Sequence, residues 1–134
     1  MKIINLSKDD VEFIDDKLDK YDSMFIENKI NGRVSIGIKD NGVLVAGLDA
    51  CMTAFRICYI STVFVEENYR RKGYGTSLMK ELERRAGGMG ANTIRLDTFD
   101  FQGKDFYIAL GYEQIGFYKN DDDKYSEYFF VKRI

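Results

Sequence analysis

The hydrophobic and polar positions of this chain follow two different periods, which divide it into predicted helices and strands. Residues 2–6 are mostly apolar and predict a short first strand. Apolar side chains then recur at helical spacing, so the expected helix spans residues 8–20, and Ser7 is placed as its N-cap. A weaker helical pattern covers residues 24–30.

The middle of the chain alternates apolar residues with small or polar ones, which is typical of strands. Residues 34–38 form the first such stretch, and the Asn41-Gly42 pair after it favours a tight hairpin turn. Residues 43–48 return as the partner strand, and residues 57–65 are apolar on both faces, as in a covered central strand. In that strand one face is expected to carry Ile57, Val63 and Val65, and the other Cys58, Ile60 and Phe64.

The second half of the chain alternates between helical and strand patterns. An apolar stripe predicts a helix over residues 73–86, and Gly87-Gly88 is expected to stop it. The remaining predicted elements are a strand, a short helix and a closing pair of strands, over residues 92–99, 103–110, 112–118 and 125–132. We therefore expect one mixed α/β domain that spans residues 1–134.

Charge and composition narrow the chemistry that this chain can perform. The net charge of -2 argues against nucleic acid as a principal partner. The chain has no histidine, which excludes a histidine triad, an imidazole metal ligand and a histidine base, and no metal site is expected. Cys51 and Cys58 are spaced neither as a metal knuckle nor as a CxxC pair, so we expect two reduced thiols in the strands.

The same composition bears on location. No apolar stretch approaches the roughly 18 residues that a membrane span requires. The N-terminus turns acidic within its first ten residues and has no signal-peptide core. The sequence therefore predicts a cytoplasmic protein that does not contact a membrane.

The strongest candidate for a binding site is the loop that precedes the helix at residues 73–86. Its Arg70-Arg71-Lys72 run is cationic, and glycines follow where the helix begins. The first amides of a helix have no partner inside it and carry partial positive charge, so they bind phosphate readily. Glycine lets these amides approach a phosphate without an intervening Cβ. The loop predicts a pyrophosphate site that needs no metal.

Two common phosphate-binding motifs do not fit this loop. The Walker A spacing is absent, and the dinucleotide pattern GxGxxG fails because Leu78 stands where the third glycine belongs. The loop instead resembles motif A of the GNAT superfamily of N-acetyltransferases, R/Q-x-x-G-x-G/A, which reads here as Arg70-Arg71-Lys72-Gly73-Tyr74-Gly75. The stretch from Phe106 to Tyr112 is similar to the FYxxxG motif B of that family. The resemblance is specific from about residue 58 to 118 and topological elsewhere.

The resemblance implies a fold, a co-substrate and a set of contacts. The implied GNAT fold has a central mixed, mostly antiparallel sheet with a V-shaped splay between its two central strands and helices on both faces. The implied co-substrate is acetyl-CoA, whose pantetheine arm would pair with the backbone of Val63, Phe64 and Val65. The residues implied to hold its pyrophosphate are Arg70, Arg71, Lys72, Gly73, Tyr74, Gly75 and Thr76.

The resemblance also implies an activity, the direct transfer of an acetyl group to a primary amine in a ternary complex. An amine like that of lysine has a pKa near 10.4, so only about one molecule in a thousand is neutral at pH 7 and a proton has to be removed. The departing thiolate, with a pKa of about 8.5, in turn needs a proton. Tyr107 occupies the position of the motif B tyrosine that supplies this proton in the family.

The base that accepts the proton of the amine is left open by the sequence. Some relatives have a glutamate on the central strand, where this chain has Tyr59, a poor base at neutral pH. Others have a glutamate early in the next strand, where Asp97 stands and would act through a water. Asp97, another acid, or no single protein base all remain possible, and Asp97 has a purely structural alternative as a partner of Arg95.

Several other features have two interpretations. Asp49, Cys51 and Tyr59 are candidates for lining the acceptor cleft, and the acidic run at residues 120–123 either attracts a cationic amine or forms a solvated turn. The main alternative function is a non-catalytic acyl-CoA-binding or sensor domain of the same fold, followed by a nucleotide-phosphate module of another fold. Dimers are common in the family, and the tyrosine-rich final strands offer an interface for a homodimer. The sequence does not specify the acceptor amine.

Overall fold

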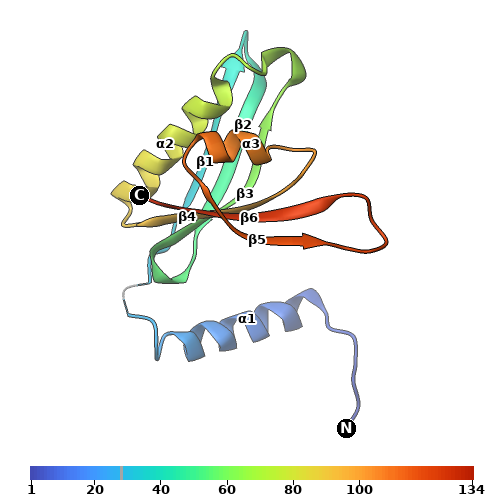
Figure 1. Cartoon of the computed structure of the whole chain (residues 1–134). Helices are drawn as coiled ribbons and strands as arrows, with labels where there is room; N and C mark the ends of the chain where they lie inside the picture. The colour runs from blue at the N-terminus through green and yellow to red at the C-terminus, as the bar shows by residue number, and fades with distance from the viewer. Residues whose placement is uncertain (28) are drawn as a thin grey trace.

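The computed structural model describes residues 1–27 and 29–134, and its centre is a six-stranded sheet (Figure 1). The strands are β1 Arg33–Asp40, β2 Val43–Met52, β3 Ile57–Val65, β4 Thr93–Phe99, β5 Glu113–Lys119 and β6 Ser126–Arg133. They lie in the order β1-β2-β3-β4-β6-β5, and within this sheet β3 and β4 are the parallel pair while the other neighbours are antiparallel. This mixed, mostly antiparallel sheet confirms the expected fold class.

The helices agree with the helical patterns of the sequence. They are α1 Lys8–Asp22, α2 Tyr74–Gly88 and α3 Lys104–Ala109, and two single 3-10 turns, η1 Ala54–Arg56 and η2 Glu67–Tyr69, flank β3. At the start of α1 the Ser7 hydroxyl accepts a hydrogen bond from the backbone N–H of Asp10 at 3.1 Å. The Asp10 carboxylate accepts one from the backbone N–H of Ser7 at 3.0 Å, which completes a capping box.

The hairpin between β1 and β2 forms as the Asn41-Gly42 pair predicts. Both residues adopt the left-handed conformation, with φ of 49° and 79°, and Asp40 pairs with Val43 directly across the turn. Two consecutive residues with positive φ match the twist of a two-residue hairpin, which is why asparagine and glycine are favoured there.

A bulge interrupts the central strand β3. Asp49 of β2 pairs with Thr62, whereas the next residue, Ala50, pairs with Ile60. Ser61 is therefore an extra residue on the β3 side of the ladder. An extra residue of this kind leaves the ladder locally disrupted and shifts the alternation of side chains by one position.

The bulge decides which side chains of β3 reach the core. Val63 and Val65 pack against the core on the same face as Ile60, which is 4% exposed. Phe64 turns away and is 52% exposed. The prediction that Val63 and Val65 lie on the face opposite to Ile60 is wrong, because a period of two holds only along an unbroken strand.

Two elements expected near the N-terminus do not form. Residues 2–6 are exposed and form no strand. Residues 24–27 and 29–30 lie outside any helix, and residue 28 of that predicted segment lies outside the described residues. A short strand or a short helix depends on neighbouring elements for its stability, and the local sequence pattern does not show whether such neighbours are present.

The end of α2 lies slightly further along the chain than expected. Gly87 and Gly88 are still helical, and the helix is closed by Gly90, which has a φ of 105°. The N–H of Gly90 bonds to the carbonyl of Gly87 at 3.0 Å, and the N–H of Ala91 bonds to that of Ala86 at 2.9 Å. This is a Schellman motif, so the required glycine is the one after the last turn.

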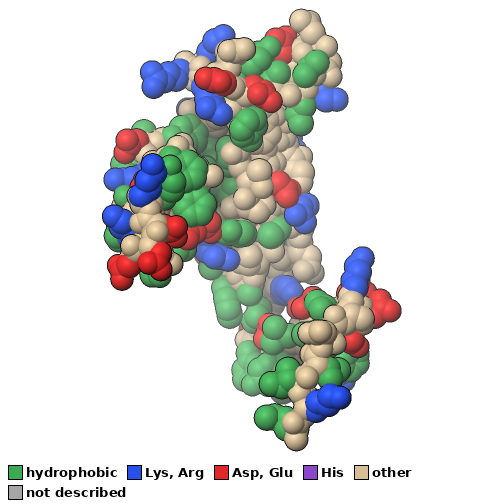
Figure 2. Space-filling view, turned by 90° about the vertical axis from the view of Figure 1, so that its right-hand side faces the viewer, with side chains coloured by type: hydrophobic (Ala, Val, Ile, Leu, Met, Phe, Trp, Pro, Cys, Tyr) green, Lys and Arg blue, Asp and Glu red, His purple; other side chains and the backbone are tan. Residues whose placement is uncertain are grey.

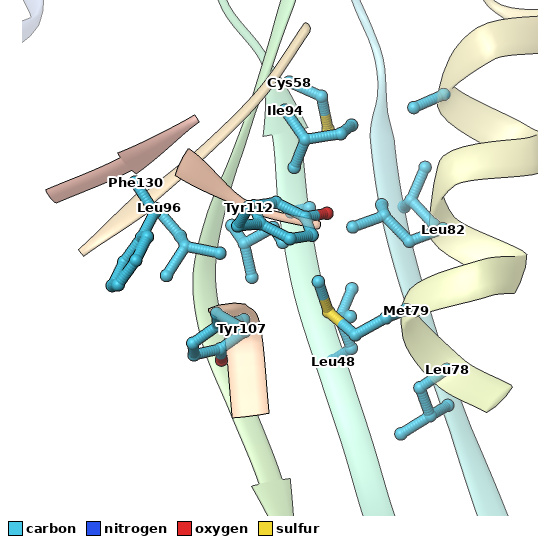
Figure 3. Packing of buried hydrophobic residues seen from close by; sticks show 14 of the residues in the cluster. Leu48, Cys58, Leu78, Met79, Leu82, Ile94, Leu96, Tyr107, Tyr112 and Phe130 are labelled. Carbon is cyan, nitrogen blue, oxygen red and sulfur yellow. The ribbon is translucent and has the colours of Figure 1, made fainter. Parts of the chain in front are cut away.

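The core lies between α2 and the sheet. Leu78, Met79, Leu82 and Ala86 form the buried side of α2. They pack with residues of the strands, and Tyr107 joins the same cluster from α3 (Figure 3). The apolar stripe read from the sequence therefore faces the sheet as predicted.

Leu82 provides a test of this packing. Its side chain is 0% exposed, so Leu82→Ala removes buried methyl groups and leaves a cavity. We expect the free energy of unfolding to fall by about 2–5 kcal/mol in urea titrations. The matched control Lys80→Ala, on the exposed side of the same helix, should change it by less than about 0.5 kcal/mol.

Helix α1 does not lie on the sheet. It is connected to β1 through residues 23–32 and stands beyond one end of the body in Figure 1. None of its residues is buried. Within the described residues, no helix is both long enough and apolar enough to cross a membrane.

Candidate active site

The two central strands separate soon after they meet. Residues Ile57–Tyr59 of β3 pair with Thr93–Arg95 of β4, and the ladder between these strands ends there. Beyond that point β3 continues beside β2, and β4 continues beside β6. The backbone from Ser61 to Val65 thus has no strand partner on its β4 side within the described residues. This is the V-shaped splay that the resemblance implied.

The loop after β3 is held in place by aromatic and cationic contacts. The Tyr69 hydroxyl donates a hydrogen bond to the Asp40 carboxylate at 2.6 Å, and the Tyr69 ring stacks on Tyr74 with 5.6 Å between centroids. Arg70 Nε donates to the backbone carbonyl of Val65 at 2.8 Å, and its guanidinium lies 5.7 Å from the ring centroid of Phe64. Arg70 therefore ties the loop to the end of β3.

The loop ends at an uncapped helix N-terminus. Gly73 is the N-cap of α2 with a φ of 84°, and no side chain caps the helix. The first amides of α2, those of Tyr74, Gly75 and Thr76, therefore have no capping partner in the described chain. A Cβ at Gly73 would meet nothing within 4 Å, so the space beside the N-cap itself is open. This arrangement fits a pyrophosphate.

The positive charge of the loop lies around these amides. Arg71 and Lys72 are exposed, and Arg71 takes a left-handed φ of 60°. The Lys72 ammonium lies 5.7 Å from the ring centroid of Tyr69. Charge of this sign next to the positive end of a helix favours an anionic group.

Gly75 allows α3 to approach the start of α2. A Cβ on Gly75 would come within 3.1 Å of the Phe106 ring and 3.8 Å of a Val65 methyl group. Phe106 therefore packs over the junction of β3 and α2. Gly75, the second glycine of the motif, has a negative φ that other residues could also adopt. It is needed because a larger side chain would collide with Phe106.

Tyr107 lies in the aromatic part of the core. Its ring is 8% exposed and contacts Tyr112 and Phe130, with centroids 5.9 and 6.2 Å away (Figure 3). Among the described residues its hydroxyl has no hydrogen-bond partner, and it keeps some contact with solvent. Burial raises the pKa of Tyr107 to about 12, so the phenol stays protonated at neutral pH.

Asp97 is paired with a residue on the other side of the splay. The Tyr59 hydroxyl on β3 donates a hydrogen bond to the Asp97 carboxylate on β4 at 2.9 Å. The pKa of Tyr59 is raised, first by this hydrogen bond and then by burial. The Arg95 guanidinium lies 4.5 Å from the Tyr59 ring centroid. Both residues can be identified as candidates from the sequence, but their pairing depends on the register of β3 against β4, which the sequence does not show.

The two candidate catalytic residues lie on opposite faces of β4. Leu96 and Thr98 are buried on the side that carries Tyr107, whereas Asp97 is exposed on the other side. The structure therefore does not bring Asp97 and Tyr107 together on one surface. A substrate would contact both Asp97 and Tyr107 only by entering the splay between β3 and β4.

The remaining candidates are explained by structural contacts. The Asp49 carboxylate accepts two hydrogen bonds from Arg33 at 3.0 and 2.9 Å and one from Ser35 at 2.6 Å, and these bonds lower its pKa to about 2. Cys58 is buried, which raises the pKa of its thiol to about 11, and Cys51 is half-buried. At neutral pH the hydrogen-bonded Asp49 carboxylate is therefore a poor base, and the Cys58 thiol is not available as a nucleophile.

The acidic loop between β5 and β6 forms a turn of its own. The backbone N–H of Asp122 bonds to the Asn120 side chain at 3.0 Å, and the N–H of Asp123 bonds to the Asn120 carbonyl at 3.1 Å. All of its residues are exposed, as in a solvated turn. In the described part of the chain, no group of three or more cysteines and acidic residues is arranged to hold a metal ion.

Comparisons with known proteins agree with this geometry. The profile of the Acetyltransferase (GNAT) family matches residues 2–112. The crystal structure of an acetyltransferase from Bacillus cereus ATCC 14579 is 30% identical, superposes with a TM-score of 0.90, and is matched over 100% of this chain and 98% of its own. No curated protein matches the sequence.

Two more distant structures share the fold and contain the cofactor of the family. An aminoglycoside 6'-N-acetyltransferase complexed with coenzyme A is 20% identical with a TM-score of 0.66, over 89% of this chain and 80% of its own. A protein from Bacillus anthracis str. Ames, assigned as a streptothricin acetyltransferase and bound to acetyl coenzyme A, is 18% identical with a TM-score of 0.70, over 81% and 66%. This chain belongs to the GNAT acetyltransferase family.

Proposed function

We propose that this chain binds acetyl-CoA and transfers its acetyl group to a primary amine by direct attack in a ternary complex. The observation that carries the proposal is the splay between β3 and β4, which opens next to the uncapped N-terminus of α2. An extended pantetheine arm fits the unpaired edge of β3, and a pyrophosphate fits the amides that follow Gly73. Bound coenzyme A in two relatives of the same fold supports this assignment.

The cofactor-binding residues follow from this arrangement. The backbone of Val63, Phe64 and Val65 would bind the pantetheine arm. Because the Val65 carbonyl accepts a hydrogen bond from Arg70, binding at that carbonyl would involve movement of the Arg70 side chain. The pyrophosphate would be bound by the backbone amides of residues 73–76 and by the charges of Arg70, Arg71 and Lys72, and no metal is involved in the proposal.

The thioester supplies an activated acetyl group. The residues of this chain would donate a proton to the departing sulfur and remove a proton from the amine. The amine nitrogen forms a bond to the acetyl carbon while the carbon–sulfur bond breaks and sulfur keeps the electron pair. Tyr107 would donate its phenolic proton to that sulfur and recover one from solvent. A phenol with a pKa of about 12 is a weaker acid than a thiol, so the transfer requires the sulfur to lie against the hydroxyl as the bond breaks.

The proton of the amine has to be removed before or during attack. Asp97 lies at the splay, and its hydrogen bond from Tyr59 holds the carboxylate in a defined position. We propose Asp97 as the group that accepts this proton, directly or through a water. A reaction in which the amine reaches the site already neutral is the alternative.

The activity is tested by following CoA release from acetyl-CoA across a library of amines. We expect at least one class of primary amine to release thiol in proportion to the acetylated product detected by mass spectrometry. Acetyl-CoA binding by calorimetry without thiol release from any amine would instead favour an acyl-CoA-binding or sensor domain.

Replacing Asp97 tests the proposed base. We expect Asp97→Asn to lower turnover by about 100-fold at pH 7, the usual scale of general-base catalysis. The deficit should shrink as the pH approaches the pKa of the amine, because the free amine then needs no base. Asp121→Asn, in the exposed β5–β6 turn, is the control. An unchanged rate in Asp97→Asn would leave the alternative in which the amine arrives neutral.

A further inference from the structure

The first 27 residues form an arm that stands apart from the rest of the chain. Figure 2 shows the arm as a separate lobe with hydrophobic side chains over its surface. Apart from Ile26, which is half-buried, its large apolar residues are at least 42% exposed, and they include Ile3, Ile4, Leu6, Val11, Phe13, Ile14, Leu18, Tyr21, Met24 and Phe25. An apolar surface of this extent marks an interaction site.

Helix α1 also needs a partner for its own stability. It has 15 residues, and isolated helices of this length are only marginally stable in water. Val11, Ile14 and Leu18 lie along one side of it at helical spacing, yet all three are exposed. The side of α1 that normally packs against a protein core is therefore uncovered.

The sheet has a matching open position along β1, its outer strand. β1 pairs with β2 on one side and with no strand on the other within the described residues. Two adjoining hollows, of about 410 and 260 Å³, run between this edge and α2. Their apolar lining comes from Val34, Ile36 and Ile38 of β1, from Leu78 of α2 and from Met89, the residue that follows α2.

Residues 2–6 have the character of a strand that would fit this edge. Their pattern predicts a strand, but in the arm they have no neighbour to pair with. An exposed edge binds an added strand through its backbone, and the side chains of that strand enter the pockets beside it. In an added strand Ile4 and Leu6 share one face and Ile3 lies on the other, so Ile4 and Leu6 together supply apolar side chains for the hollows.

The arm and the body carry opposite net charges. Residues 1–27 contain four lysines and eight acidic residues, a net charge of -4, so the rest of the chain carries +2 of the total of -2. The lining of the hollows contains Arg33, Arg84 and Arg85 together with Glu81, and the three arginines form ion pairs with Asp49 and Glu81. The attraction between the arm and the body therefore comes from their opposite net charges rather than from free arginines at the hollows.

The extended arm is also part of the likeness to the Bacillus cereus structure. In a TM-score each residue contributes a value of at most 1, and these values are averaged over the chain. If only residues 28–134 superposed, the score could not exceed about 0.8. The observed 0.90 over the whole chain requires much of the arm to superpose as well. The extended position of the arm is therefore shared with a relative of 30% identity.

We propose that the arm is exchanged between two copies of this chain. Residues 2–6 of each copy add a strand to the outer edge of β1 in the other copy, and α1 packs its apolar side against that second copy. The two contacts are identical, so the exchange closes as a symmetric dimer in which each edge is covered. The proposal does not depend on acetyl transfer.

The strand contact is tested by Ile4→Pro. Proline has no backbone N–H and cannot complete the ladder, whereas Ile4→Val keeps both the N–H and a β-branched side chain. In sedimentation equilibrium we expect the wild type and Ile4→Val at twice the 15.5 kDa of one chain, and Ile4→Pro at least tenfold weaker in dimerisation. Circular dichroism should show an intact body in all three proteins.

The origin of the cover is tested with a single tryptophan. The chain has no tryptophan, so Ile14→Trp makes the only one, on the apolar side of α1. Cover by a second copy predicts a shift of its emission to shorter wavelength as protein concentration rises, since association follows mass action. Ile4→Pro combined with Ile14→Trp should need a higher concentration for the same shift.

Three results would overturn the proposal. A monomer whose tryptophan is buried at every concentration would mean that the arm folds onto its own body. A tryptophan that stays exposed at every concentration would mean that nothing covers the arm. A dimer that Ile4→Pro leaves as tight as the wild type would mean that the edge of β1 takes no part. Acetyl-CoA binding, measured separately, would be unaffected by each of these results.

Discussion

Gly73→Asp is expected to abolish CoA binding. The substitution puts a carboxylate in front of the amides proposed to hold the pyrophosphate, where it repels the phosphates and competes for the same N–H groups. Loss of two charge-assisted hydrogen bonds, at about 1.5–3 kcal/mol each, corresponds to a loss of affinity of at least about 100-fold. Isothermal titration calorimetry with CoA measures this change.

Two variants separate the effect of charge from that of backbone strain. Gly73→Ala keeps the φ of 84° unfavourable for a side chain but adds no charge, so its loss of affinity should be much smaller than that of Gly73→Asp. Gly42→Asp, in the β1–β2 hairpin, has a similar φ of 79° and open space around its Cβ position. It should cost stability and leave affinity intact. Unchanged affinity in Gly73→Asp would refute the assignment of the loop.

Tyr107→Phe is expected to lower turnover by at least about 100-fold while CoA affinity stays within about twofold. The phenol is proposed to act only as the carbon–sulfur bond breaks, and such an interaction contributes to kcat rather than to binding. Because the hydroxyl has no hydrogen-bond partner among the described residues, removing it leaves no buried group unsatisfied. Stability should therefore be almost unchanged, and steady-state kinetics with calorimetry distinguish the two effects.

The pH dependence provides a second check on Tyr107. Burial raises its pKa to about 12, so the protonated form required of an acid persists through pH 10 and no loss of rate from this group is expected there. Tyr118→Phe, an exposed tyrosine of β5, is the matched control and should behave as the wild type. If Tyr107→Phe turned over at the wild-type rate, sulfur would be protonated by another group or by solvent.

The local elements of the fold could be predicted from the sequence wherever burial and exposure alternate with the period of a helix or a strand, or where neighbouring residues form a known cap or turn. The stripe on α2 and the capping box of α1 are determined by residues three or four positions apart, and the two-residue hairpin turn by adjacent ones. The cationic loop and the glycines before α2 belong to the same group. They identified the candidate phosphate site, because a helix start is a local structure.

Contacts between distant segments could not be predicted in this way. The bulge at Ser61 reverses the faces of Val63 and Val65, and it exists only in the register between β2 and β3. The bond from Tyr59 to Asp97 depends on how far two parallel strands run together before they separate. The same separation creates the splay between β3 and β4, which the periodicity of apolar residues does not show.

The sequence alone was sufficient for the helices, the turns and the motif that indicated the family, since short-range sterics and hydrogen bonding decide them. Tertiary structure decided that Tyr107 and Asp97 lie on opposite faces of β4, and that residues 2–6 have no strand partner among residues 1–27 and 29–134. The physical reason is that strand pairing and burial are satisfied by whichever neighbour the whole fold provides. A segment that reads as a strand specifies its need for a partner, and the assembled molecule determines where that partner lies.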